Sequence, residues 1–100
     1  MGTINGLSDA EEERLEMLAE ECGEAIQVIC KILRHGYVSY HPSDTKYTSN
    51  WEHLKHELND IKAIMYGMTQ AGDYDQSDFS RSEYEEIWAK KQKWTHHQNG

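Results

Sequence analysis

Several features that would point away from a small helical protein are scarce or missing in this sequence. Its 100 residues include one proline and one phenylalanine, and no stretch alternates between apolar and polar residues as a half-buried strand does. No apolar run approaches the roughly 18 residues of a membrane span. No basic segment followed by an apolar one marks a signal peptide. We therefore expect neither a sheet nor a membrane partner.

Positive charge is scarce as well. Ten lysines and arginines stand against 18 aspartates and glutamates, which gives a net charge of −8. That balance has the wrong sign for a protein that neutralises the phosphates of a nucleic-acid polymer. An acidic protein can still act on a triphosphate, because divalent cations can lie between its carboxylates and the phosphates.

Apolar content is low for a chain that must bury a core by itself. Hydrophobic residues make up 37% of the sequence, and the mean hydropathy is −0.90. A chain of 100 residues has the size of one domain. We expect a single domain over 1–100, with a flexible arm at 1–7 and a flexible tail at 95–100. A chain this polar has a thin core or completes it by oligomerising, and we expect a homodimer or homotetramer.

The two cysteines, Cys22 and Cys30, fall within one expected helix. Their Cα atoms are about 12 Å apart at 1.5 Å per residue, which is too far for a disulfide. We predict reduced thiols in the core and a cytoplasmic protein.

Three segments carry the signals of a helix. Each begins at a serine that is followed three residues later by a glutamate, the pattern of a capping box. The three pairs are Ser8 with Glu11, Ser49 with Glu52, and Ser80 with Glu83. The expected helices cover about 8–34, 49–68 and 81–95. The predicted fold class is all-α: a small bundle of about three main helices, with a four-helix-type core completed by oligomerisation.

The first two helices have an apolar stripe and a second face that carries acids. The stripes recur at spacings of three and four. Their members are Leu15, Leu18, Cys22, Ile26, Ile29 and Leu33, then Trp51, Leu54, Leu58, Ile61 and Met65. We expect Trp51 in the core, with Trp88 and Trp94 of the third helix. The second faces carry Val28 and Ile64 beside their acids, so they too need a layer to pack on. We expect another subunit to supply that layer.

Four carboxylates on these second faces stand out by their spacing. Glu21 and Glu24 are three residues apart, as are Glu57 and Asp60, so each pair lies on one face of its helix. Two such pairs on antiparallel neighbours would surround one cavity. All-oxygen ligation of this type suits Mg²⁺ or Mn²⁺, and the packed charge is tolerable only with cations present. An acidic chain also contains such pairs by chance, as parts of a solvated face.

At these residues the chain resembles the MazG-like superfamily, whose members are all-α nucleoside triphosphate pyrophosphohydrolases. The signature of the superfamily is EExxE followed by ExxD. The first half is present as Glu20, Glu21 and Glu24, the second as Glu57 and Asp60, and the likeness spans residues 12–68. The 32 residues between Glu24 and Glu57 make a connection on the long side for the superfamily. This tyrosine-rich loop leaves the base preference open.

The resemblance implies hydrolysis of a (deoxy)nucleoside triphosphate to the monophosphate and pyrophosphate. It also implies Mg²⁺, replaceable by Mn²⁺, held by Glu21, Glu24, Glu57 and Asp60, with Glu20 or Glu21 acting on the attacking water. The chain is similar in size to phage-encoded members, including a type that hydrolyses dGTP or GTP, which would work in the host cytoplasm. A dUTP/dCTP-type or phosphoribosyl-ATP pyrophosphatase is an alternative within the superfamily. A non-enzymatic helical interaction module is an alternative outside it.

A few basic residues are candidates for binding the phosphates. Lys31 lies two turns beyond Glu24 on the same face, and Arg34 follows one turn later. In the last turn of the helix both equally suit the helix dipole. The other candidates form a basic cluster near the C-terminus, a pattern that is usually a solvated face. Its members are Lys90, Lys91 and Lys93.

Two further patterns have an ordinary interpretation. His53 and His56 have a spacing that can hold Zn²⁺, but no cysteine or third histidine stands at a matching spacing, so we predict exposed or supporting histidines. Asp73, Asp75 and Asp78 lack the glycine and terminal glutamate of a Ca²⁺ loop, so we predict a turn.

Overall fold

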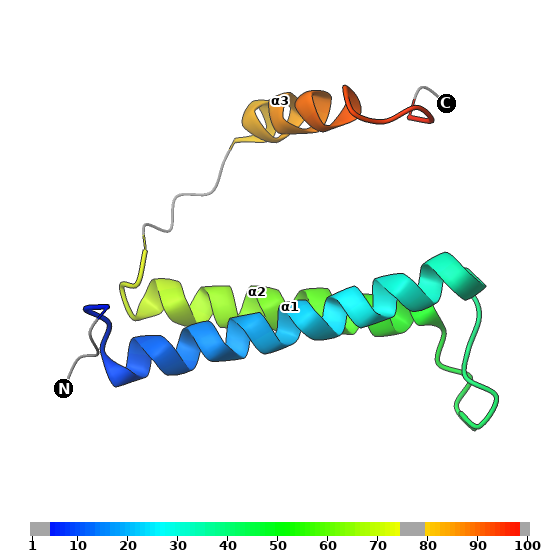
Figure 1. The fold of residues 1–100 in the computed structure, drawn as a ribbon, viewed down its shortest axis with the longest axis horizontal. Helices are drawn as coiled ribbons and strands as arrows, with labels where there is room; N and C mark the ends of the chain where they lie inside the picture. The colour runs from blue at the N-terminus through cyan, green and yellow to red at the C-terminus, as the bar shows by residue number, and fades with distance from the viewer. Residues whose placement is uncertain (1–4, 75–79, 99–100) are drawn as a thin grey trace.

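A computed structural model describes residues 5–74 and 80–98 of the chain. This part consists of three helices, α1 (Asp9–His35), α2 (Asn50–Gln70) and α3 (Arg81–Gln92), without strands. α1 and α2 lie side by side and antiparallel, and α3 lies apart from both (Figure 1). The predicted all-α class is confirmed. The predicted arm at 1–7 and tail at 95–100 fall partly outside the described residues.

The serine signals mark the start of all three helices. The Ser8 side chain accepts a hydrogen bond from the Glu11 backbone, and the Glu11 carboxylate accepts one from the Ser8 backbone in return. Ser80 opens α3 in the same two-way manner. At α2 only half of the predicted capping box forms. The Glu52 backbone N–H donates to the Ser49 hydroxyl, but the Glu52 carboxylate accepts a hydrogen bond from that hydroxyl instead of from the Ser49 backbone N–H. These local bonds satisfy first-turn amides that have no partner within the helix.

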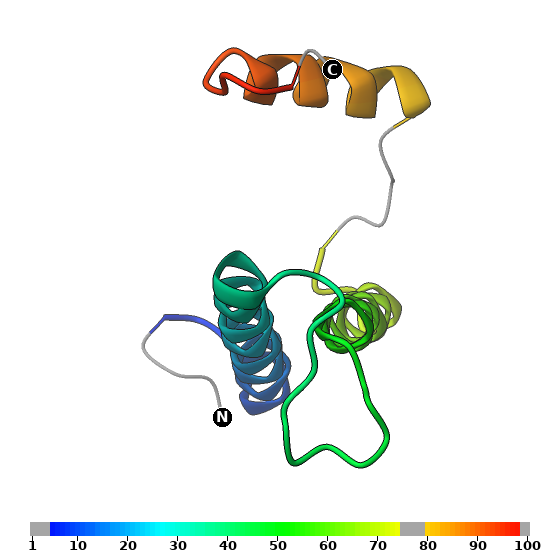
Figure 2. The ribbon, with the colours of Figure 1, turned by 90° about the vertical axis from the view of Figure 1, so that its right-hand side faces the viewer.

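The connection from α1 to α2 turns the chain back on itself. Gly36 ends α1 with φ of +88°, a conformation that costs glycine little, and its N–H donates to the carbonyl of Ile32. Asn50, the first residue of α2, is buried, and its side-chain amide donates to the Gly36 carbonyl over 3.1 Å. This bond holds the end of α1 beside the start of α2 and makes the pair a helical hairpin (Figure 2).

The hairpin is packed along a row of positions that repeat every seven residues on each helix. Buried or half-buried residues line this α1–α2 interface. They are Leu18, Glu21, Ala25, Val28 and Ile32 from α1, and Leu54, Glu57, Ile61, Ile64 and Met68 from α2. A spacing that alternates between three and four is the pattern of two helices packed almost in line. The acids Glu21 and Glu57 therefore belong to the interface itself.

This interface corrects the prediction of which face needs another subunit. The faces that carry the acids, with Val28 and Ile64, pack against each other within one chain. The predicted stripes are instead largely exposed, including Ile29 and Leu58. Cys22 and Cys30 are free thiols as predicted, but they are exposed rather than in the core. The reason is geometric: α1 has apolar residues over more than half of its circumference, and α2 covers only one side.

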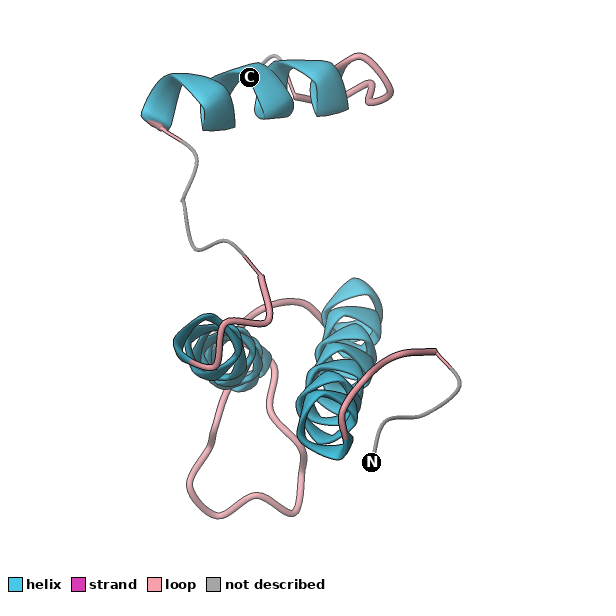
Figure 3. Ribbon diagram, turned by 90° about the vertical axis from the view of Figure 1, so that its left-hand side faces the viewer, coloured by secondary structure: helices cyan, strands magenta, loops and turns pink. Residues whose placement is uncertain are grey.

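A second correction concerns the tryptophans. Trp51, Trp88 and Trp94 are all exposed, contrary to the prediction that they lie in the core. No residue of α3 is buried, and among the described residues α3 makes no packing contact with α1 or α2 (Figure 3). Its aromatic residues therefore have no core to enter within one chain.

An ion pair closes the open end of the hairpin. The Arg14 guanidinium, near the start of α1, donates two hydrogen bonds to the Asp73 carboxylate just after α2, over 2.6 and 2.8 Å. Such a two-pronged pair fixes both position and orientation. Asp75 and Asp78 of the predicted turn lie outside the described residues. Within the described residues, no helix is both long and apolar enough to cross a membrane.

Candidate metal centre

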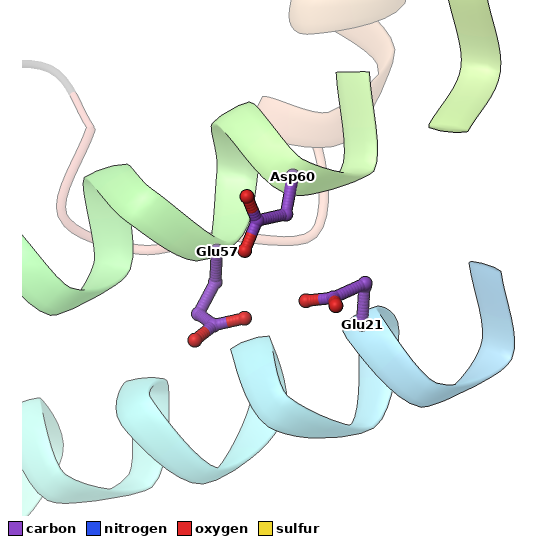
Figure 4. A group of neighbouring side chains, drawn as sticks. All are labelled: Glu21, Glu57 and Asp60. Carbon is purple, nitrogen blue, oxygen red and sulfur yellow. The ribbon is translucent and has the colours of Figure 1, made fainter. Parts of the chain in front are cut away.

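Two glutamates face each other from the two helices of the hairpin. Glu21 lies near the middle of α1. Glu57 lies about two turns after the start of α2. Both are half-buried, because each occupies an interface position that an apolar residue would normally fill. The antiparallel packing brings both side chains into the space between α1 and α2 (Figure 4).

Asp60 joins this pair from the next turn of α2. One carboxylate oxygen from each of Glu21, Glu57 and Asp60 lies within 4.8 Å of the other two. In Figure 4 the three side chains point toward one another across the gap between the helices. Asp60 is exposed, so the group opens to solvent on its side. We call these three residues the acid cluster.

Two buried oxygens of the acid cluster have no hydrogen-bond donor outside the cluster in the part of the chain that the structure describes. Oε2 of Glu21 and Oε2 of Glu57 are enclosed by protein, and no amide, hydroxyl or cationic group of the described residues donates a hydrogen bond to either. The two ion pairs found among residues 5–74 and 80–98 lie elsewhere, at Arg14 and Arg81. Buried polar atoms almost always have a partner in folded proteins, so two orphaned oxygens point to a missing proton or cation.

The crowding also changes the acidity of Glu21. A hydrogen bond shared with Glu57 is the largest cause, followed by burial and by repulsion from Glu24 and Asp60. Together they raise the pKa of Glu21 from its ordinary 4.5 to about 7. Without a cation, Glu21 is therefore partly protonated at neutral pH.

Glu24 lies beside the acid cluster rather than within it. Its pKa is raised, first by a hydrogen bond with Glu57 and then by the charge of Glu57 and by burial. It lines a cleft of about 260 Å³ that also contains Glu57. The structure therefore brings three of the four predicted metal ligands together and leaves Glu24 at the edge. Glu20, the other predicted catalytic residue, lines a neighbouring hollow with Glu21 and Asp60.

The cleft and the hollow lie on one flank of the hairpin. Counted at about 100° per residue, Glu24 and Lys31 lie roughly 80° to one side of the centre of the interface on α1. His53 and Asp60 lie at the same offset on α2. Because the helices are antiparallel, equal offsets place all four on the same side, and the cleft and hollow linings agree with this count. We call this side the acid flank.

The predicted phosphate-binding residues have different outcomes. Lys31 lines the cleft with Glu24 and Glu57. Arg34 is exposed and lines neither the cleft nor the hollow. Lys90 and Lys93 are on α3 or at its end, and α3 does not contact the hairpin in the described residues. Of these predicted residues, Lys31 is the one that lies beside the acids.

Three polar residues of the cleft were not singled out as site residues by their sequence. Gln27, Asn50 and His53 line it together with Val28. Asn50 was not recognised as a site residue because it stands at the start of a helix. His53 was not recognised because no other zinc ligand stands at a matching spacing. The position of His53 four residues before Glu57 was the available signal, because it places both side chains on adjoining turns of one face.

Comparisons of the chain with protein-family models, curated proteins and solved structures gave no match.

Proposed function

We propose that the protein is a metal-dependent hydrolase that splits a nucleoside triphosphate into the monophosphate and pyrophosphate. The observation that carries this proposal is the convergence of three carboxylate oxygens from two helices within 4.8 Å. The orphaned oxygens of Glu21 and Glu57 support it, because a cation is the simplest partner for both. The resemblance of the two carboxylate motifs to the MazG-like superfamily adds the reaction.

The donor set fits Mg²⁺, with Mn²⁺ as a substitute. Every candidate ligand is a carboxylate oxygen, and both ions prefer oxygen donors. Glu21, Glu57 and Asp60 would hold the ion, and Glu24 at the edge of the cleft would complete the set or hold a second ion. The open side at Asp60 leaves room for water and phosphate oxygens. When bound, Mg²⁺ neutralises charge on the phosphates and makes water a better nucleophile.

The remaining residues of the acid flank suit the substrate. Lys31 lines the cleft together with Glu24 and Glu57, and its ammonium group would bind a phosphate oxygen. Gln27, Asn50 and His53 offer hydrogen-bonding groups to the sugar and base. A cleft of about 260 Å³ holds part of a nucleotide, so the triphosphate would extend over the acid cluster toward solvent.

Glu20 is our candidate for the group that accepts a proton from the attacking water. It lines the hollow beside Glu21 and Asp60 but is outside the acid cluster, so it stays free to act as a base. Water adds its oxygen to the phosphorus on one side of the α–β bridging oxygen, and Glu20 would take the proton that the water loses. The α–β bridge then breaks, and the two products leave as monophosphate and pyrophosphate. We further propose dGTP or GTP as the substrate, on the resemblance to phage-encoded members alone.

A substrate panel tests the proposal. The protein is incubated with Mg²⁺ or Mn²⁺ and each common ribo- and deoxyribonucleoside triphosphate, and monophosphate, pyrophosphate and free phosphate are resolved. Monophosphate and pyrophosphate in equal amounts from at least one substrate are expected. Glu57→Gln should abolish the turnover, and Glu16→Gln, an acid on the exposed side of the same hairpin, should retain it. Metal-independent turnover, or full activity in Glu57→Gln, would contradict the assignment.

A further inference from the structure

The cleft extends along the hairpin, from beside the acid cluster toward the loop that joins α1 to α2. Glu24 and Glu57 line one end of it, and Lys31 and Asn50 line the other. Lys31 stands seven residues after Glu24, and Asn50 stands seven residues before Glu57, so on antiparallel helices both lie in the same direction. Seven residues span about 10 Å along a helix. The cleft therefore has an acid end and, roughly 10 Å away, a loop end.

The backbone N–H groups at the loop end already have partners. The start of a helix can bind a phosphate through its first amides. At the start of α2, however, the N–H groups of residues 50–53 donate to the carbonyls of Ser39, Tyr37 and Ser49 and to the Ser49 hydroxyl. The Lys31 side chain leans back toward the acid end, because side chains on a helix tilt toward its N-terminus. The loop end therefore suits an uncharged part of the substrate.

Asn50 places a buried amide at the loop end. It is 7% exposed and is the one polar residue of 5–74 and 80–98 in the buried class. Its Nδ2 donates to the Gly36 carbonyl over 3.1 Å. Because a backbone carbonyl can only accept, this bond fixes which way the amide is turned. Its Oδ1 accepts no hydrogen bond from the described residues. A buried acceptor of fixed orientation in the lining of a cleft is suited to an N–H or O–H group of a ligand.

The loop next to Asn50 carries two exposed tyrosines. In Figure 2 the loop projects below the helices, and α1 runs toward the reader with α2 on its right. The right-handed turn of the helices then places the acid flank on this same lower side. Tyr40 directly follows Ser39, whose carbonyl accepts the Asn50 N–H. The rings of Tyr40 and Tyr47 pack edge-on with centres 5.0 Å apart, and both remain exposed. Exposed rings offer a surface on which a flat base can stack.

We infer that the nucleobase of the substrate binds at the loop end of the cleft, where the Asn50 Oδ1 accepts a hydrogen bond from an N–H group of the base. The nucleotide itself rests on the proposed function, and the cleft adds its direction: the base lies toward the loop and the phosphates lie over the acid cluster. Asn50 is then a specificity-determining residue. In guanine, the ring N1–H and the 2-amino group share one edge, and either can donate to this oxygen. A sugar hydroxyl is the other donor of a nucleotide, and the tyrosines beside the loop end favour the base.

Substrates that each lack one N–H group of the base test the inference. They are dGTP, its inosine analogue without the 2-amino group, and its N1-methyl analogue; if the substrate panel selects another base, the matching analogues of that base replace them. kcat/KM is measured for the wild type, Asn50→Ala and Asn59→Ala, in which Asn59 is an exposed asparagine of the same helix. The wild type and Asn59→Ala should reject one analogue by at least about tenfold, because the Asn50 oxygen is left unpaired. Asn50→Ala should lose most of that preference, whereas loss of the Gly36 hydrogen bond alone would slow all three substrates equally.

A wild type that accepts all three substrates equally, or a preference that Asn50→Ala retains, would overturn the base subsite and leave the hydrolase proposal standing. If Asn50→Ala unfolds, or if no nucleotide is turned over, NMR of the wild type with dGMP decides. The side-chain amide signals of Asn50 should shift severalfold more than those of Asn59, and a dideoxy analogue of dGMP should shift them equally. Equal shifts at both asparagines would refute the subsite. A shift that disappears with the dideoxy analogue would assign the Asn50 oxygen to the sugar and also refute it.

Discussion

Replacing Glu57 by glutamine tests whether the two half-buried carboxylates of the α1–α2 interface share a proton. The hydrogen bond with Glu57 is the largest cause of the raised pKa of Glu21, which lies at about 7 against an ordinary 4.5. In Glu57→Gln the amide can donate to the Glu21 carboxylate, and one negative charge disappears. Both changes favour ionised Glu21. Its pKa should therefore fall from about 7 toward 4.5.

The same change has a consequence for stability in metal-free protein. Because the pKa of Glu21 is higher in the folded than in the unfolded chain, the folded chain binds more protons between those two values. The stabilisation from neutral Glu21 is present below about pH 4.5 and is lost as the pH rises through about 7. The wild-type melting temperature should fall across that interval, and the fall should be smaller in Glu57→Gln.

The assay is a carbon-detected NMR titration of the glutamate carboxyl groups, with melting curves at each pH, in the presence of a chelator. Glu16→Gln is the control, since Glu16 is exposed on the same helix as Glu21 and should leave the titration unchanged. A Glu21 titration that stays near pH 7 in Glu57→Gln would refute the shared proton. A wild-type titration near 4.5 would refute the crowding of the cluster itself.

Three further predictions concern metal binding, the packing of the α1–α2 interface, and the ion pair between Arg14 and Asp73. Mg²⁺ at about ten times its dissociation constant should stabilise the wild type by about 1.4 kcal/mol, or roughly 6–11 °C in melting temperature, and Glu57→Gln should lose most of that shift. Val28→Ala removes two methyl groups from the buried interface and should cost about 1.5–2.5 kcal/mol in urea unfolding, while the exposed Val38→Ala should cost less than about 0.5. The Arg14 hydrogen bonds hold the pKa of Asp73 below its ordinary 3.8, so this pair stabilises above that pH and the effect is lost on acidification. Asp73→Asn should lack that acid-side loss in a pH titration followed by circular dichroism.

The helix boundaries were predictable because their signals are local. Ser8, Ser49 and Ser80 each bond to an amide three residues ahead, and such a bond depends on nothing outside the first turn. The stop at Gly36 is local for the same reason. The Arg14 and Asp73 pair was not predicted, since 59 residues separate its partners and only the closed hairpin brings them together.

The face of α1 that packs against α2 was harder to predict, because the sequence of α1 is compatible with two different packing faces. The apolar stripe through Cys22 and Ile29 is stronger than the row through Ala25 and Val28, so counting apolar residues favours the wrong face. The better signal was agreement between helices, in which Glu21 and Glu57 take equivalent places in matching seven-residue rows. Single-helix patterns do not contain that information.

The acids were predictable as a group, but their arrangement was not. Spacing alone placed Glu21 with Glu24 and Glu57 with Asp60, each pair on one helix face. The structure places Glu21 and Glu57 in the interface and Glu24 beside it, so the closest group is three carboxylates from both helices. That difference depends on the rotation of each helix about its axis, which the interface decides.

Calorimetric titration of metal-free protein with Mn²⁺ tests most directly whether the acid cluster is a metal site. We predict saturable binding to the wild type and to Glu16→Gln, with protons released on binding near pH 7, because the cation displaces the proton held by Glu21 and Glu57. Binding should weaken at least tenfold in Glu57→Gln. Equal affinity in all three proteins, or no binding to the folded wild type, would contradict the account.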